Sequence, residues 1–138
     1  MAYSFSLDDV KFLRSRHGEK ALEVASSLDL SAASMLADIA ELRARYAGHD
    51  AALIETVTCR RRARGKLRGA DDLLLSDEAL QQATNSVVAE HRAAEIAARF
   101  PDAVVHDITC SIGAELIELE RCAGIRGVIG SDLDRIRL

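Results

Sequence analysis

The feature that most constrains the fold is a pattern close to the C-terminal end of the sequence. A strand-like segment at residues 103–107, Ala-Val-Val-His-Asp, is followed by a short loop with a single glycine, Gly113, and then by a helix-forming segment from Ala114. A second strand-like segment at residues 127–130 is followed by the acidic Asp132. A strand, a helix and a second strand within about thirty residues favour a parallel β-α-β unit. Ligands of such units bind where the strands end, so we expect a ligand site at this edge.

The rest of the sequence favours helix. Proline occurs once and tryptophan is absent, while apolar residues make up 49% of the 138 positions, which is ample for a hydrophobic core. Because few residues break helices, most of the length is expected to be helical. The net charge of −4 excludes a protein that binds polyanions through its bulk charge, so any nucleic-acid contact would need a local basic patch.

Capping residues and apolar spacing predict four helices in the first half of the chain. They are expected from a Ser6 cap to about Arg16 with Gly18 as terminator, over about 19–28, from a Ser31 cap to about Ala47, and from about Asp50 into a strongly basic end. The predicted fold class is therefore mostly α at the N-terminal side, as a helical bundle.

The second half begins with further helix signals. Ser76 is expected to cap a short helix, and Thr84 or Ser86 a longer one that runs to about Phe100. The boundary between the parts is placed near residues 69–76. Residues 1–70 are then a helical accessory domain, and residues 71–138 are the first part of a Rossmann-like α/β domain that contains the β-α-β unit.

The cysteines bear on the cellular compartment. Cys59, Cys110 and Cys122 form no CxxC pair, and their odd number and wide spacing fit reduced thiols in a cytoplasmic protein better than a disulfide framework. For the same reason no metal site is expected. Residues 1–9 show no basic segment followed by a long apolar run, so neither a secretory signal nor a membrane span is predicted.

The loop after the first predicted strand discriminates between ligand classes. Residues 109–113 contain one glycine, and the dinucleotide fingerprint GxGxxG is absent. A pyrophosphate needs several glycines so that the backbone can approach it closely, whereas S-adenosylmethionine carries no phosphate. The loop therefore favours the methyl donor over a nicotinamide dinucleotide. An aspartate after a strand is common in α/β proteins, so Asp107 and Asp132 have a purely structural alternative.

The same region resembles a known family. Residues 107–113, Asp-Ile-Thr-Cys-Ser-Ile-Gly, are similar to the first motif of class I S-adenosylmethionine-dependent methyltransferases, most of all to the trimethylguanosine-synthase-like group with Asp-x-Phe-Cys-Gly-x-Gly. Thr109 replaces the aromatic residue of that motif and Ser111 replaces its first glycine.

Two further motifs follow the same family in order and spacing. Residues 128–134 resemble the second-strand motif that ends Asp-Ile-Asp, and residues 84–91 resemble the entry helix Thr-Pro-Glu-x-Ile-Ala-Glu-His, with Asn85 in place of proline. The whole chain also resembles bacterial methyltransferases that carry a later THUMP-like domain. That resemblance implies an RNA substrate.

The resemblance implies a set of cofactor-binding residues. Asp107 would lie near the ammonium of the methionine moiety, and Asp132 would accept hydrogen bonds from both ribose hydroxyls. Leu133 would pack on the adenine, and Gly113 would let the backbone pass close to the cofactor. The set is completed by Thr109, and by Thr84 and Gln82 near the methionine carboxylate.

Each of these residues also has a structural interpretation. Asp107 could brace its loop, Gly113 could form a tight turn, and Thr84 could be a plain helix N-cap. Cys110 is interpreted as a buried loop thiol and not a nucleophile. His91 and His106 are expected to be structural because neither has the spacing of a metal ligand.

A basic run follows the fourth predicted helix. It has six cations in nine residues with no acid among them: Arg60, Arg61, Arg62, Arg64, Lys66 and Arg68. The run could bind RNA phosphates with an affinity that falls steeply with salt. Alternatively it is a solvated helix end whose cations interact with the C-terminal dipole. No aromatic residues interleave it, so base stacking is not supported.

The leading functional hypothesis is therefore the N-terminal part of an S-adenosylmethionine-dependent RNA methyltransferase. A non-catalytic helical RNA-binding or adaptor module is the first alternative, and a fragment of a dinucleotide oxidoreductase is the second. No catalytic residue is assigned, because acceptor-binding residues of this fold normally follow the fourth strand and the sequence ends at Leu138. Residues 1–138 alone are accordingly expected to have no turnover, and to self-associate through an exposed sheet face.

Overall fold

The computed structural model describes residues 3–137. Met1, Ala2 and Leu138, which belong to the N-terminal segment and the chain end considered above, lie outside the described residues. The elements in chain order are α1 (Leu7–Leu13), α2 (Arg16–Ser27), α3 (Met35–Arg45), α4 (Asp50–Ala63), a 3-10 turn (Ala70–Asp72), α5 (Asp77–Gln82), α6 (Ser86–Arg99), β1 (Ala103–Asp107), α7 (Ala114–Arg121) and β2 (Ile125–Gly130).

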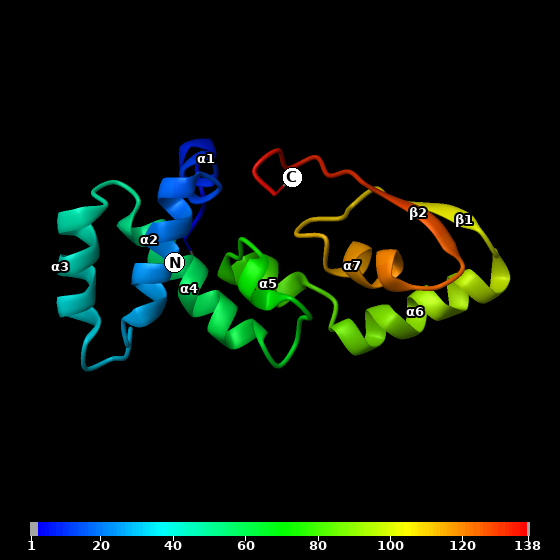
Figure 1. Cartoon of the computed structure of the whole chain (residues 1–138), viewed down its shortest axis with the longest axis horizontal. Coiled ribbons are helices and arrows are strands. Elements are labelled where there is room, and N and C mark those ends of the chain that lie inside the picture. Colours follow the sequence, from blue (N-terminus) through cyan, green and yellow to red (C-terminus); the bar gives the residue numbers. More distant parts are fainter. Residues whose placement is uncertain (1–2, 138) are drawn as a thin grey trace.

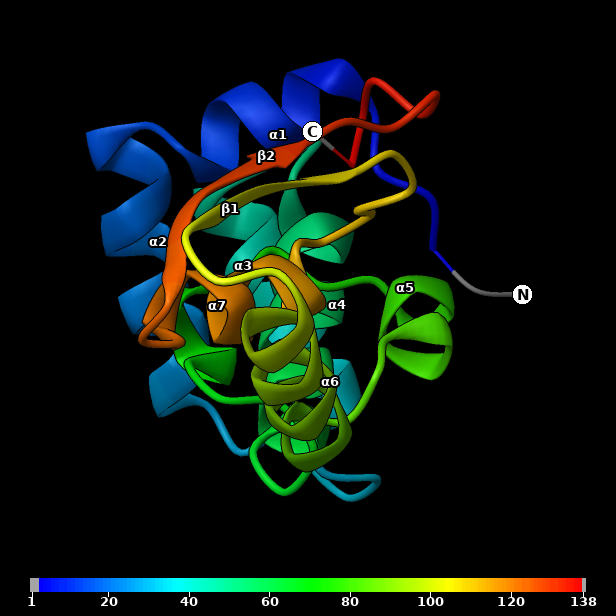
Figure 2. The same cartoon turned by 90° about the vertical axis from the view of Figure 1, so that its right-hand side faces the viewer.

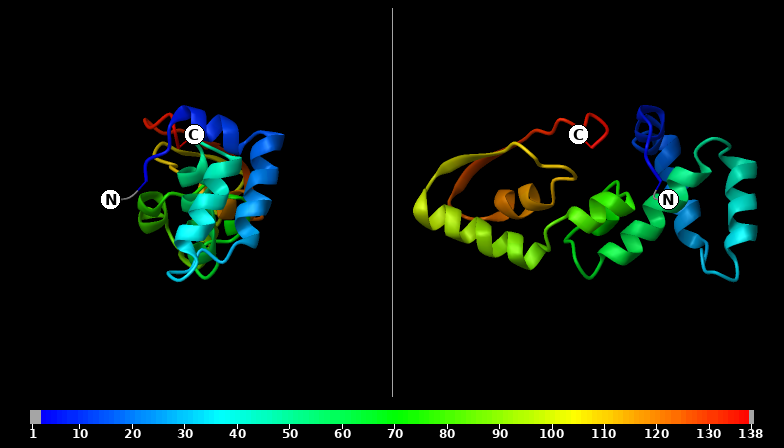
Figure 3. Two further views of the ribbon diagram at one scale, coloured as in Figure 1. Left: turned by 90° about the vertical axis from the view of Figure 1, so that its left-hand side faces the viewer. Right: turned by 180° about the vertical axis from the view of Figure 1, so that it is seen from behind.

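The molecule is elongated, with two structural units joined through α5 (Figure 1). Helices α1 to α4 lie at one end, and α6, α7 and the two strands lie at the other. After β2 the chain turns back over α5 toward α1, as the rear view in Figure 3 also shows. The described residues are mostly helical and contain a small parallel sheet, as expected, while the assignment of that sheet to a Rossmann-like domain stays a prediction. No helix among residues 3–137 is both long and apolar enough to cross a bilayer.

The first two helices begin at serine caps. The side chain of Ser6 accepts the backbone N–H of Asp9, and the Asp9 carboxylate accepts the N–H of Ser6 in return, which forms a reciprocal capping box. The prediction that Gly18 terminates the first helix is wrong. The first helix ends at Leu13, Ser15 caps α2, and Gly18 lies in the first turn of α2.

The real requirement for glycine at this position is space. A Cβ at Gly18 would lie 2.0 Å from the carbonyl oxygen of Phe12, so α1 and α2 meet in a corner that no larger residue fits. The other predicted boundaries shift by smaller amounts. The third helix starts at Met35, four residues after the expected cap Ser31, and α4 begins at Asp50 as expected.

The helical unit has its own hydrophobic core. Leu13, Leu42 and Leu53 are at most 2% exposed and come from α1, α3 and α4. Alanines of α2 and α4 fill the remaining space between the helices. This end of the molecule is therefore packed as an ordinary globular core.

A second apolar cluster crosses the predicted domain boundary at residues 70/71. It joins Cys59 and Ala63 of α4 with Leu75, with Leu80 of α5 and with Ala114 at the start of α7. The boundary itself stays a prediction. The packing shows that the chain on its two sides shares one cluster.

The two strands are parallel, as predicted, with Val105 opposite Val128 and Asp107 opposite Gly130. Helix α7 packs against β2, and α6 packs against α7 (Figure 2). The opposite face of the sheet carries Val104 and Ile129, which are each about half exposed. One sheet face is therefore covered by helices, and within the described residues the other is open.

Helix α6 begins differently from the expectation. Its N-cap is Asn85, whose side chain accepts the N–H of Val87, so neither Thr84 nor Ser86 is the cap. The hydroxyl of Ser86 instead accepts the N–H of Arg68 at 2.8 Å. The displaced Thr84 side chain becomes available to the site described below.

Candidate ligand site at the ends of the two strands

A cavity of about 450 Å³ lies beside the loop that follows β1. This volume is in the range of small-molecule sites in proteins. Its lining includes four of the seven predicted cofactor residues, contributed by the α5–α6 connection and by the end of β1: Gln82, Thr84, Asp107 and Thr109. Residues that are distant in sequence thus converge on one hollow. The wall is completed by Ala83, Arg92, Cys110, Ser111, Ile112, Ala114 and Glu115.

The loop is braced at its start by Asp107. The Oδ1 atom of Asp107 accepts the N–H of Thr109 at 3.0 Å and lies 3.4 Å from its hydroxyl. This Asx-type turn confirms the loop-bracing interpretation of Asp107. It engages one carboxylate oxygen, and it leaves the acceptor capacity of the other for a ligand in the cavity that Asp107 lines.

Two residues of the loop have left-handed backbone conformations. Gly113 has φ of +76° and precedes α7, and a Cβ there would meet nothing closer than 3.9 Å. Its requirement is therefore the tight turn and not close contact with protein. Ser111 has φ of +47°, which glycine adopts freely and serine does not. Ser111 occupies the position where the methyltransferase motif has its first glycine, so the conformation agrees with the motif although the residue does not.

Ser111 is also the residue through which the two strand ends are joined. Its N–H donates to Oδ2 of Asp132 at 2.9 Å, while Oδ1 of Asp132 accepts the N–H of Asp134 at the same distance. The hydrogen bonds from Asp134 and from Ser111 hold the pKa of Asp132 below its ordinary value. The Ser111 hydroxyl oxygen is buried without a hydrogen-bond partner among residues 3–137.

Asp132 is therefore a loop-bracing carboxylate in this structure. Each oxygen accepts one backbone N–H and retains capacity for another donor, so the geometry is compatible with ribose hydroxyls. Asp132 does not line the cavity itself but contacts its wall through Ser111. Leu133, the predicted adenine contact, is fully exposed beside it.

The loop, β2 and α7 fit together closely at Gly130. A Cβ at this position would lie 2.4 Å from Cδ1 of Leu116 and 3.0 Å from the Cys110 sulfur, so a larger residue would require these side chains to move. Burial, and then the charges of Asp107 and Asp132, raise the pKa of the Cys110 thiol. A thiol that resists deprotonation is a poor nucleophile, which agrees with the prediction that Cys110 is structural.

An ionic network that the sequence analysis missed lies in the cavity wall. Glu115, in the first turn of α7, accepts a hydrogen bond at Oε1 from the Thr84 hydroxyl at 2.7 Å. The same oxygen forms an ion pair with Arg92 of α6. The pairing joins positions 31 and 23 residues apart, and no local sequence signal reports contacts of that range.

The basic run is engaged in intramolecular contacts along its whole length. The Arg61 guanidinium donates to the carbonyls of Ser26, Leu28 and Asp29 and so caps the end of α2. Arg68 pairs with Glu118 at 3.0 Å, and the Glu118 side chain is 2% exposed. The other four cations also have partners, which are the Leu73 carbonyl for Arg60, Asp77 for Arg62, Asp71 for Arg64, and the Leu80 and Gln81 carbonyls for Lys66.

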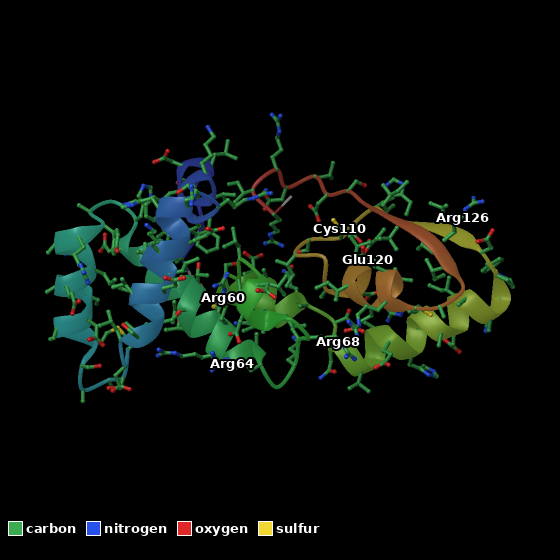
Figure 4. The ribbon with its side chains drawn as sticks, viewed as in Figure 1. Arg60, Arg64, Arg68, Cys110, Glu120 and Arg126 are labelled. Atoms are coloured by element: carbon green, nitrogen blue, oxygen red, sulfur yellow. The ribbon has the colours of Figure 1, made fainter. Side chains whose placement is uncertain are left out.

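Apart from those of Arg61, which lie within the helical unit, these contacts join α4 and the segment after it to the rest of the chain. Figure 4 shows Arg60, Arg64 and Arg68 following one another along the junction from α4 toward α6. Burial lowers the pKa of Arg60, which is the most enclosed of them. Arg62 and Arg64 are more than half exposed, and their ion pairs lie at the surface. Binding of RNA by the run stays a prediction, and the structure makes these two side chains its best candidates.

His106 lies on the open sheet face and shares a hydrogen bond with Ser131, and His91 is exposed on α6. No group of three or more possible metal-ligating side chains occurs within residues 3–137. A larger hollow of about 840 Å³ lies between α1, α2, α5 and the turn after β2, and Ile112 and Asp134 are among its lining residues.

The amino-acid sequence is similar to that of two known proteins. Two proteins of Mycobacterium tuberculosis, from the strains CDC 1551 / Oshkosh and ATCC 25618 / H37Rv, are each 50% identical to the chain over 103 residues. Both carry the name uncharacterized S-adenosylmethionine-dependent methyltransferase. The match covers 70% of this chain but only 27% of each relative, so the chain spans about a quarter of their length.

A second comparison concerns the helical unit alone. Residues 6–63 match a family model described as a domain of unknown function, DUF8688. These residues run from the cap of α1 to the end of α4. No solved structure matches the chain significantly.

Proposed function

We propose that the chain binds S-adenosylmethionine at the ends of β1 and β2, and that it forms the N-terminal part of a methyltransferase that acts on RNA. The observation that carries the proposal is the 50% identity to two proteins named as methyltransferases that use this cofactor. The β-α-β geometry supports it, because a cavity of suitable size lies where ligands of such units bind.

The residues present fit the cofactor. Asp107 offers a free carboxylate oxygen within the cavity, and Asp132 retains acceptor capacity beside it. Leu133 presents an exposed apolar side chain next to Asp132, as an adenine contact would require. When bound, the cofactor supplies an electrophilic methyl group on a sulfonium. The residues of this chain bind and orient it, and orientation provides a large part of the rate in such displacements.

Calorimetric titration of the 138-residue chain with S-adenosylmethionine tests the proposal. We expect saturable binding of the methyl donor and none of NAD, and the reverse order would favour the dinucleotide alternative. Asp132→Ala should weaken binding by about 10- to 100-fold because hydrogen bonds to a charged acceptor are lost. Asp132→Asn should lose less, since one acceptor oxygen remains.

A carboxylate at the opposite end of the same sheet provides the control. Asp102 is exposed, 3.7 Å from Arg126, and distant from the cavity wall. Asp102→Asn should leave the affinity unchanged. An unchanged affinity in Asp132→Ala would show that the ribose contact is assigned to the wrong residue.

RNA as the methyl acceptor rests on the family resemblance and on the basic run. Arg60 and Arg61 bind backbone carbonyls, so replacing them would disturb the fold. The guanidinium groups of Arg62 and Arg64 are more than half exposed, and such ion pairs contribute little to stability, so a phosphate could displace their partners. Arg62→Gln with Arg64→Gln should therefore reduce RNA affinity and flatten its salt dependence.

Measuring cofactor binding by the same double variant distinguishes an RNA methyltransferase from a non-catalytic RNA-binding module. The double variant should bind S-adenosylmethionine as the parent chain does. RNA binding without any cofactor binding would favour the non-catalytic RNA-binding module. Equal RNA binding by parent and variant at every salt concentration would mean that the run serves only the fold.

The open sheet face exposes apolar side chains that self-association would cover. Val104 and Ile129 are half exposed there, with the exposed Ile108 following β1. We propose that a second copy of the chain covers this face, and that the 138 residues alone do not transfer methyl groups. Sedimentation should show a dimer that Ile129→Thr weakens, and a methyl-transfer assay on total RNA should show no turnover.

A further inference from the structure

The charged groups of the cavity wall have a pattern that the assigned contacts do not use. Asp107 and Glu115 are acidic, and Arg92 is basic. Their formal sum is one negative charge. The methyl donor at neutral pH carries a sulfonium, an ammonium and a carboxylate, which sum to one positive charge. The wall is thus complementary to the donor in net charge and contains both signs.

Glu115 holds Arg92 in place at the cavity. Its Oε1 atom receives both the Thr84 hydroxyl and one terminal N–H of the Arg92 guanidinium. Because the Thr84 hydroxyl binds the same oxygen, that oxygen is held by two groups from different segments. A guanidinium has five N–H donors in a rigid fork, so Arg92 retains donors for a second carboxylate.

The plain alternative is that the Arg92–Glu115 pair is a surface ion pair. The Arg92 side chain is 51% exposed and the Glu115 side chain 26% exposed, and a pair of that kind stabilises a protein little. Two facts distinguish it from the other surface pairs of the chain. Both partners line the cavity, and Asp107 and Thr84, two of the predicted cofactor residues, line it with them.

We propose that Arg92 binds the carboxylate of the amino-acid end of the ligand, while Asp107 receives its ammonium. Glu115 and Thr84 act as positioning residues that hold the guanidinium in place. The site then selects a ligand with a free α-amino acid group, and it rejects analogues that lack the carboxylate. This inference rests on the proposed binding of S-adenosylmethionine and goes beyond it by naming the specificity-determining residue.

Ligands that differ in one group test the proposal directly. The 138-residue chain is titrated with S-adenosylmethionine and with its decarboxylated form, which keeps the sulfonium and the amine. The parent chain should bind the complete ligand about 10-fold more tightly, as expected for a charge-assisted hydrogen bond. In Arg92→Met the ratio of the two affinities should fall close to one, because only the complete ligand loses a contact.

Two further variants make the result specific. Arg92→Lys keeps the charge but not the fork, so it should retain part of the ratio. Arg99→Met removes an exposed cation seven residues farther along α6 and should leave the ratio unchanged. Circular dichroism of each variant confirms that the helices are intact.

The outcomes distinguish failure of the carboxylate contact from failure of cofactor binding itself. Binding of both ligands with a ratio near one in the parent chain would overturn the role of a carboxylate contact. A ratio that survives in Arg92→Met would assign that contact to another residue and overturn this inference alone. Failure of the parent chain to bind either ligand would overturn this inference and the proposed function together.

Discussion

The two ends of the molecule differ in how completely they bury their side chains. The largest fully buried side chains, among them Leu13, Leu42, Leu53 and Leu75, all precede residue 76. Of the nine large apolar side chains that are exposed within residues 3–137, seven follow residue 86. The helical unit therefore carries its own stability, whereas the β-α-β unit depends on what packs against it.

The difference follows from the work that each unit can do. A ligand site needs an accessible strand edge, loops in unusual backbone conformations and polar groups with unused capacity, and each of these opposes dense packing. Ser111 and Asp132 show such features next to the cavity. The contacts of the basic run with both units compensate by joining the open unit to the packed one.

The largest expected effect is in the packed core. Leu53→Ala should lower the free energy of unfolding by about 2–5 kcal/mol, because the side chain is 0% exposed and its removal leaves a cavity. Denaturant unfolding measures the loss. Leu119→Ala in α7 is the counterpart at the open end and should lower the free energy of unfolding by less. In this variant, faster hydrogen exchange should be confined to amides of the β-α-β unit. Equal losses with global exchange in both variants would abolish the distinction between the two ends.

The next effect concerns the contacts that join the units. Removing Arg68 leaves the buried carboxylate of Glu118 without its partner, so Arg68→Ala should cost about 1–3 kcal/mol, reduced from the value for a fully buried pair because Arg68 is half exposed. Arg64→Ala removes a similar charge whose partner Asp71 is exposed, and it should cost about 0–1 kcal/mol. Urea denaturation compares the two. A larger loss in Arg64→Ala would show that charge, and not burial of the partner, determines the value.

Acid should weaken both ends through one aspartate in each. Burial alone would raise the pKa of Asp9, but hydrogen bonds from Ser6, His49 and Tyr3 hold it below the ordinary value of 3.8, and the pKa of Asp132 is also lowered. For a lowered pKa, the stabilisation is complete above the ordinary value and is lost as the pH falls through the lowered one. The midpoint of thermal unfolding should therefore fall less between pH 7 and pH 3 in Asp9→Asn than in the parent chain. A similar fall in both chains would remove Asp9 as the cause.

The smallest effect is expected at the loop residue with positive φ. Ser111→Gly should stabilise the chain by about 1 kcal/mol, because glycine adopts φ of +47° without the strain that a Cβ causes. The substitution also removes a buried hydroxyl that has no partner among the described residues. Thermal unfolding followed at a β-α-β amide would detect the gain. A loss of stability would indicate that the hydroxyl has an unrecognised role in the loop.

The sequence predicted the features that depend on neighbouring residues. Ser6 and Ser76 mark helix starts because caps act within one turn, and alternating strand and helix segments defined the parallel sheet. It failed where distant residues meet. Gly18 was interpreted as a helix terminator because glycine often ends helices. Its actual role, which is to leave space for the carbonyl of Phe12, depends on how α1 and α2 meet and has no local sequence signal.

The site was predicted to the same extent and for the same reason. Motif positions identified Asp107, Thr109 and Gly113, whose hydrogen bonds and backbone conformations lie within one loop, and their role in binding a cofactor stays a prediction. The Arg92–Glu115 pair and the partners of the basic run lie 7 to 50 residues apart, and a charged residue gives no sequence signal of where its partner will be. The run therefore looked free for RNA although the fold engages each of its cations.

The distribution of buried side chains along the chain also sets an order in time. A ribosome releases the N-terminal residues first, and a unit whose core is contained in them can fold while the remainder is still being made. The core of α1 to α4 is complete before α6 is synthesised. Arg61, Lys66 and Arg68 then lie on a surface that is already formed, so the late-emerging β-α-β unit has Arg68 as a binding partner for Glu118 when it arrives. The helical unit can therefore be folded before the β-α-β unit emerges, and the residues of the ligand site are the last of these parts to be made.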